Sequence, residues 1–218
     1  MKTTPAQSKQ TQSKCGFHLA ATGLLCVAFI SLTSCSFLKP AQSVARHFVL
    51  TATATNIPAV TANPIAVGVG PVKLPAYLFN SPMAIRKHLN EVEYLPTANW
   101  AERLDAGFQR VLSANLATLL GTDRVYLSAW QKSDVQAELH VIIEQFDVDA
   151  TGRGQLAVRW RVVSPGGDQL LKSGISRLDR SGPAPESDTP GAVATLSELA
   201  YDFSREMART ISAAIPRR

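Results

Sequence analysis

The fold is decided by the stretch Val135-Gln136-Ala137-Glu138-Leu139-His140-Val141-Ile142-Ile143-Glu144, in which apolar and polar residues alternate. Alternation with a period of two predicts a β-strand that buries one face and keeps the other polar. Phe146 and Val148 change the parity of the pattern, which predicts a β-bulge near Gln145. The fold is therefore built around a sheet.

Two more strands are predicted after this one, over residues 155–162 and 171–177. Residues 149–154 and 164–168 separate the three strands and are rich in the turn formers Gly, Asp, Ser and Pro. Short turns between alternating strands predict an antiparallel meander. Its polar face is expected to carry Glu138, His140, Arg159, Arg161 and Lys172.

Further strands are predicted earlier in the chain. Residues 47–51 and 65–72 form two of them, and the glycines of the second (Gly68 and Gly70) leave room for another backbone to approach. Residues 84–86 and 92–95 are predicted to form a short hairpin that turns near Leu89-Asn90.

Two helices are predicted from apolar residues at helical spacing. The first is capped by Asn99 with Glu102 three residues on, and it ends at Gly121. Its stripe is Trp100, Leu104, Phe108, Val111, Leu112, Leu116, Leu119 and Leu120. The second follows a Pro/Gly/Ser-rich loop at 181–191 and starts at Thr189-Pro190. Its stripe is Val193, Leu196, Leu199, Ala200, Phe203, Met207 and Ile211.

These elements predict an α+β fold. The expected architecture is a two-layer sandwich, in which two main helices cover one face of a mixed, mostly antiparallel sheet. The other face meets water or a partner.

The amino-terminal residues predict a lipid anchor. A basic stretch precedes an apolar run from Leu19 to Leu32, which is typical of a secretory signal and is too short to span a bilayer. Leu32-Thr33-Ser34-Cys35 follows and resembles the bacterial lipobox. We expect residues 1–34 to be a lipoprotein signal peptide, residues 35–45 an acylated Cys35 with a tether, and residues 46–218 one folded domain. The alternative is an ordinary signal peptide with an incidental cysteine.

Composition argues against several other classes of protein. The chain of 218 residues carries a net charge of +5, but residues 1–34 contribute three lysines and no acid, which leaves 19 basic against 17 acidic residues. So small a balance does not suggest a nucleic-acid-binding protein. Cys35 is the sole cysteine after the leader, which excludes an internal disulfide and a Cys-based zinc site.

No catalytic motif is present in the sequence, which has neither a Gly-x-Ser-x-Gly elbow nor a His-Glu-x-x-His helix. We therefore predict no catalytic residues, no metal and no cofactor.

Two surfaces are candidates for binding a partner. Arg159 and Arg161 project from the same side of one strand, so they are either contacts for lipid headgroups or an acidic partner, or a solvated strand face. Tyr77, Leu78 and Phe79 form either an exposed apolar patch or a loop folded onto the core.

Over residues 46–214 the chain resembles the auxiliary lipoproteins of ABC-type lipid transport systems, the paraquat-inducible protein C-like group. The resemblance rests on Val69-Gly70-Pro71-Val72-Lys73-Leu74-Pro75 with Tyr77-Leu78, on Arg86 with Asn90-Glu91-Val92, on Trp100-Ala101-Glu102-Arg103-Leu104 and on residues 115–125. The chain departs from the family's pattern at 79–87, where it is more apolar.

This resemblance implies a non-enzymatic outer-membrane lipoprotein that faces the periplasm. It implies docking to the conduit of a protein with mammalian-cell-entry (MCE) domains, and self-association into a ring that matches a multimeric tube. By the same resemblance Lys73 and Arg86 join the candidate contact residues. Two alternatives are a periplasm-facing lipoprotein that itself binds lipid in a cavity, and an envelope hydrolase.

Overall fold

A computed structural model describes residues 44–54 and 64–215. Cys35 and the leader lie outside the described residues, so the structure does not test the predicted acylation. The elements in chain order are β1 (Arg46–Phe48), β2 (Val67–Val69), the 3₁₀ helix η1 (Ala76–Phe79), β3 (Pro82–His88), β4 (Glu91–Trp100), α2 (Leu104–Leu120), β5 (Val125–Tyr126), β6 (Ala137–Asp149), β7 (Arg153–Val163), β8 (Leu170–Ser181) and α3 (Thr189–Ala214).

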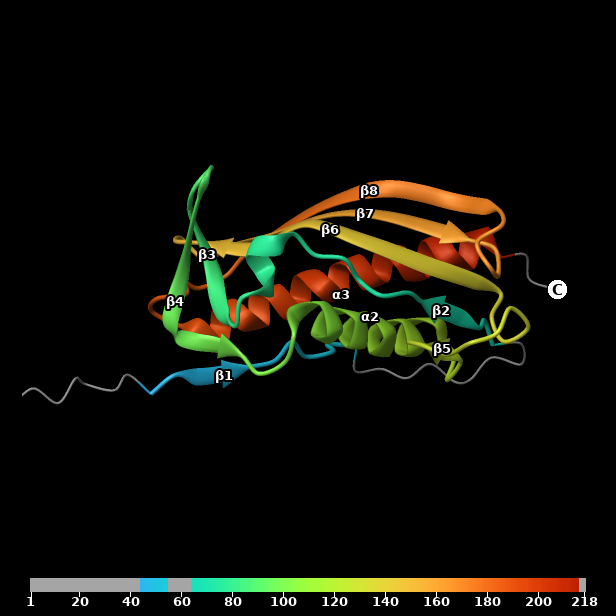
Figure 1. The fold of residues 1–218 in the computed structure, drawn as a ribbon, viewed down its shortest axis with the longest axis horizontal. Helices are drawn as coiled ribbons and strands as arrows, with labels where there is room; N and C mark the ends of the chain where they lie inside the picture. The colour runs from blue at the N-terminus through green and yellow to red at the C-terminus, as the bar shows by residue number, and fades with distance from the viewer. Residues whose placement is uncertain (1–43, 55–63, 216–218) are drawn as a thin grey trace, which may run out of the picture. The chain divides into compact units, whose positions relative to one another are not determined.

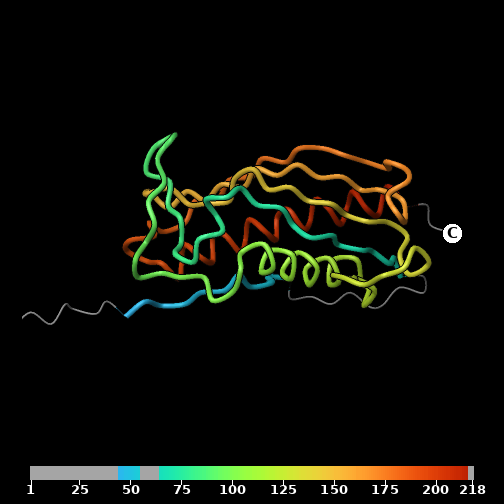
Figure 2. The backbone as a smooth tube through the Cα atoms, in the orientation of Figure 1, coloured from blue at the N-terminus to red at the C-terminus, as the bar shows by residue number. Residues whose placement is uncertain are grey.

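The sheet is organised around the long strand β6 (Figure 1). On one side β7 and β8 continue it as the predicted antiparallel meander. On the other side β2 runs parallel to the first part of β6, and β3 runs parallel to its end. The chain from β2 to η1 follows β6 along its length, as the tube in Figure 2 shows. The register shifts between Ile143 and Gln145, which confirms the predicted bulge.

Both helices cover one face of this sheet, so the predicted α+β sandwich is confirmed. The side chains between the layers are buried, and they include Phe108, Phe146 and Phe203, whose rings meet at the centre of the core. All seven residues of the predicted stripe on α3 are buried. Asp188 caps this helix by accepting a hydrogen bond from the amide of Gly191.

The predicted start of the first helix is wrong. The chain remains a strand through Trp100, and α2 begins at Leu104 with no side-chain cap. Asn99 and Trp100 instead pair with residues of β1, and Glu102 forms an ion pair with Arg110. Strand pairing therefore overrides a local capping signal. The predicted end is confirmed, because Gly121 adopts the left-handed conformation with φ of 63°.

The remaining strands agree with the sequence in kind, though not always in length. The hairpin β3–β4 turns at Leu89-Asn90 as predicted, and in Figure 1 it projects from one end of the sheet. β1 and β2 have only three residues each and are shorter than predicted. Neither α2 nor α3 combines the length and apolarity that a membrane-crossing helix requires.

Candidate docking surface on the open sheet face

The face of β6, β7 and β8 that points away from the helices carries a row of mixed residues. Strand register places Lys73, Ile142, Arg159 and Ile175 side by side on four neighbouring segments. Ile142 and Ile175 are 44% and 43% exposed, which is unusual for isoleucine in a sheet. Arg159, between them, donates a hydrogen bond of 2.8 Å to Glu144.

A second row lies one step toward the start of β6. It contains His140, Arg161 and Ser173, all of which are exposed. The His140 ring lies against Gly70, where a Cβ would meet its Nδ1 at 3.2 Å. A backbone atom also lies close to Gly70, as the sequence predicted, because the Leu139 carbonyl oxygen would be 3.5 Å from the same Cβ.

We call this middle part of the open face the sheet floor. It comprises Lys73, His140, Ile142, Arg159, Arg161, Ser173, Ile175 and Arg177. Arg177 belongs to it because β8 places it opposite Ala157, two residues from Arg159. Lys73, Arg161 and Arg177 form no ion pair within residues 44–54 and 64–215.

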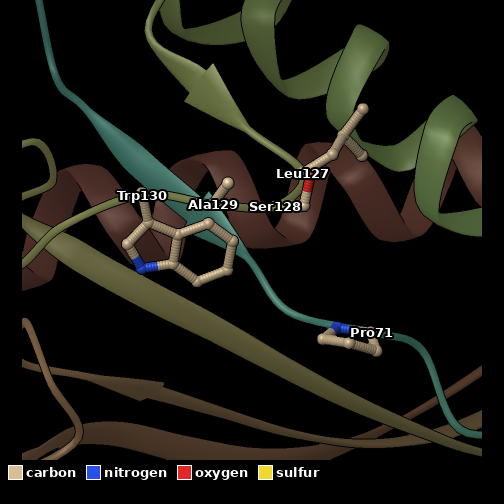
Figure 3. A pocket seen from close by; sticks show the side chains of 5 residues that line it. All are labelled: Pro71, Leu127, Ser128, Ala129 and Trp130. Atoms are coloured by element: carbon tan, nitrogen blue, oxygen red, sulfur yellow. The ribbon is translucent and has the colours of Figure 1, made fainter.

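Trp130 covers one end of the floor (Figure 3). Its ring lies over Gly68, where a Cβ would sit only 2.6 Å from the indole. The indole Nε1 donates a hydrogen bond of 3.2 Å to Glu138. Beside the ring, Pro71, Leu127, Ser128 and Ala129 line a shallow pocket of about 350 Å³.

Glu138 is held in its ionised form at this end. It is only 8% exposed, although the sequence placed it on the polar face. Burial acts to raise the pKa of Glu138, but hydrogen bonds from the Gly166 amide and the Trp130 indole, together with nearby His140, hold the pKa below its ordinary value. This carboxylate therefore fixes both the tryptophan and the turn before β8.

Tyr77, Arg86 and Asp147 cover the other end of the floor. Asp147 is 1% exposed and accepts hydrogen bonds from Arg86 Nη2 at 2.6 Å and from the Tyr77 hydroxyl at 2.9 Å. Burial, followed by the neighbouring Asp147 carboxylate, raises the pKa of Tyr77 above its ordinary value. The hydrogen bond to Asp147 raises the pKa of Arg86. The three groups form a satisfied polar cluster that ties η1 and β3 to β6.

The structure separates the predicted contact residues. Leu78 is buried in the core, so it is not available to a partner, and Tyr77 is half-buried in the polar cluster. Phe79 is 53% exposed and lies under the guanidinium of Arg103 at 5.5 Å. The candidate patch at 77–79 is thus reduced to the exposed ring of Phe79. Arg86 is engaged in the ion pair with Asp147.

Lys172 is the one predicted member of the polar face that lies on the other side. Its register partner is Val162, so it shares the helix-covered face, while Arg161 and Ser173 share the open one. The parity of β8 is opposite to the one expected because Ser176, not Ile175, points inward. The Ser176 hydroxyl accepts from the Trp160 indole and donates to Glu206, which makes burial of this serine favourable.

The position of Trp130 over Gly68, the burial of Glu138 and the place of Arg177 on the open face were not predicted from the sequence. The sequence does contain a signal for a covering side chain at this end. Gly68 has no side chain and pairs with Glu138, so space is left on that face of the sheet. Which side chain fills that place is decided by a loop that carries no periodic pattern. Ala129 in that loop has a positive φ of 57°, a conformation that a non-glycine residue adopts at a cost of about 1 kcal/mol.

Known proteins share this fold. An uncharacterised protein of known crystal structure matches with a TM-score of 0.61 and 20% identity, over 77% of this chain and 99% of that one. Protein XCC0632 from Xanthomonas campestris matches with a TM-score of 0.63 and 13% identity, over 75% of this chain and 93% of that one. Identities this low establish the fold alone. No curated protein sequence matches the chain.

The family is identified from the sequence itself. Residues 48–208 match the profile of the ABC-type transport auxiliary lipoprotein component, which covers almost the whole folded part and agrees with the resemblance seen in the motif around Gly70. The chain belongs to the family of ABC-type transport auxiliary lipoprotein components.

Proposed function

We propose that this protein is an outer-membrane lipoprotein that docks the periplasmic MCE conduit of an ABC-type phospholipid transporter. The observation that carries the proposal is the family match over residues 48–208, joined to a lipobox that ends at Cys35. In this proposal the protein faces the periplasm and performs no catalysis. Its contribution is to hold the conduit at the membrane.

The anchor follows from the chemistry of acylation. Acyl chains on Cys35 stabilise membrane binding by about 0.8 kcal/mol per buried CH₂, so two or more chains hold the protein stably. Residues 36–45 reach at most about 35 Å when fully extended. The residue after the cysteine is Ser36. An aspartate there is typical of inner-membrane retention in lipoproteins, so its absence supports the outer membrane.

Lipid carriage in a cavity is the alternative from the sequence, and no observation favours it. The space between the sheet and the helices is filled by buried side chains. The pocket beside Trp130 is shallow and open to solvent, so it does not enclose an acyl chain. We therefore propose docking, with the open sheet face as the surface that remains for a partner.

The anchor is tested by replacing Cys35→Ala. The variant should fold, escape acylation and leave the outer-membrane fraction, because the leader alone provides no stable anchor. Fractionation of the envelope and mass spectrometry of the mature amino terminus measure this. A variant that still fractionates with the outer membrane, or a wild-type terminus without acyl chains, contradicts the lipid anchor.

Docking is tested by crosslinking in intact cells. With normal expression and lipidation, an MCE-domain protein should be recovered in a covalent adduct with this chain. Delipidated protein prepared without Cys35 should carry no phospholipid through purification. Failure to recover an MCE-domain protein, combined with co-purifying lipid, would favour the carrier over the docking protein.

A further inference from the structure

We propose that the sheet floor binds an acidic, aliphatic segment of the partner protein. This inference rests on the proposed docking function and adds where the partner binds and what chemistry it presents. Three observations support it: the unpaired charges of the floor, its exposed isoleucines, and the raised ends on either side.

The charges favour an acidic occupant. Lys73, Arg161 and Arg177 have no acidic partner among the described residues, and Glu144 pairs with Arg159. Glu138 is mostly buried beneath Trp130, so its charge is already engaged. Elsewhere Arg103 and Arg153 pair with acids, and the exposed arginines without an ion pair among the described residues, such as Arg124 and Arg209, lie singly on other elements. The floor therefore brings three cations without an ion pair onto neighbouring segments of the sheet, which favours an acidic partner.

The apolar residues require more than an anion. Ile142 and Ile175 flank Arg159 on the two neighbouring strands, so their Cα positions are about 10 Å apart. A free phosphate or a carboxylate would satisfy the arginines and leave both isoleucines in water. A segment with aliphatic side chains between acidic ones covers the isoleucines and pairs the cations at once.

The shape favours a protein segment over a membrane. At the two ends of the floor, Trp130 stands over Glu138 and Tyr77 stands over Asp147, and both carboxylates are buried as a result. These positions are nine residues apart on β6, about 30 Å. A flat bilayer would meet the raised ends first, whereas one helix, about 10–12 Å across, fits between them.

The experiment places a photo-crosslinking amino acid in the full-length, lipidated protein in cells. Positions 142 and 175 probe the floor, position 172 probes the opposite face of the same sheet, and position 209 probes the exposed side of α3. We expect protein adducts from 142 and 175 that map, by mass spectrometry, to an acidic, aliphatic segment of an MCE-domain protein. Positions 172 and 209 should give little adduct.

Charge reversal sharpens the test. Lys73→Glu with Arg161→Glu should lower the yield of adduct from position 142 about tenfold, because both changes turn attraction into repulsion. Lys172→Glu is the control for charge reversal outside the floor, since it changes an exposed cation of β8 on the other face, and it should leave the yield unchanged. Yields are normalised to the amount of folded, acylated protein.

Several results would overturn the inference. They are an adduct with the mass of a phospholipid, a crosslinked segment without acidic residues, or equal sensitivity to Lys172→Glu. Capture of an MCE-domain protein from position 209 but not from 142 or 175 would refute this inference and leave the proposed function standing. Capture from none of the four positions would contradict both.

Discussion

Each of the two raised ends of the sheet floor buries a carboxylate of β6, but the two ends do so by different chemistry. At one end an ion pair is buried, because Asp147 lies almost fully inside and depends on Arg86 and Tyr77. At the other an aromatic ring fills the space over a glycine, and Glu138 anchors the ring by one hydrogen bond. The first end depends on charge compensation and the second on steric fit, so the two should fail differently when they are mutated.

The largest expected effect is at the ion-pair end. Arg86→Leu leaves the Asp147 carboxylate buried without its counter-charge, which should lower the free energy of unfolding by about 3–5 kcal/mol. Urea unfolding of the leaderless chain, followed by circular dichroism, measures the loss.

The control is the double variant Arg86→Leu with Asp147→Leu. Replacing both partners removes the uncompensated charge, so most of the lost stability should return. Equal losses in the single and double variants would mean that the cluster acts through packing, and the contrast between the two ends would then disappear.

Most of the helix-covered side was predictable from the sequence. Leu139, Val141 and Ile143 show the period of a strand, and the change of parity at Phe146 gave the position of the bulge. The stripe on α3 has a period of 3.6 and is buried as expected. These features are local, because burial of one face imposes a repeat on consecutive residues.

The open face, and the places where the predictions from the sequence were wrong, depend on contacts between distant segments. Trp130 reaches Gly68 from another loop, and the capping signal at Asn99 yields to pairing between β1 and β4. The predicted face of Lys172 was wrong because Ser176, which shares its face of β8, points inward. The Ser176 hydroxyl is stabilised there by an indole and a carboxylate from outside its own strand. The family motif around Gly70 pointed to this face without showing which rings cover it.

A smaller effect is expected at the aromatic end. Gly68→Val introduces a Cβ at 2.6 Å from the Trp130 ring, which must move away, and overpacking of this kind costs about 1–3 kcal/mol. The urea midpoint should fall, and tryptophan fluorescence should shift as the ring becomes exposed.

Two further variants identify the cause. Trp130→Ala in the Gly68→Val background removes the clash, so the second change should be less harmful there than in the parent chain. Gly70→Ala is a control with milder crowding, because its Cβ meets Nδ1 of the partly exposed His140 ring at 3.2 Å and the Leu139 carbonyl oxygen at 3.5 Å, and we expect a loss below about 1 kcal/mol. Strict additivity of Gly68→Val and Trp130→Ala would argue against steric fit.

The smallest effect is a pH dependence confined to the aromatic end. The pKa of Glu138 is lower in the folded protein than in the unfolded chain, where a glutamate titrates at about 4.3. The unfolded state therefore binds the proton more readily, so Glu138 contributes stability above the unfolded pKa and loses it as the pH falls through the folded pKa. Glu138→Gln should thus destabilise the protein at pH 7, and the difference from the parent should shrink in acid.

Trp130→Phe keeps an aromatic ring but removes one donor to the carboxylate, so it should raise the pH at which this contribution is lost. Urea midpoints of the three proteins across the acid range measure both changes, and a constant difference between Glu138→Gln and the parent would show that the carboxylate's charge has no part in holding this end of the floor.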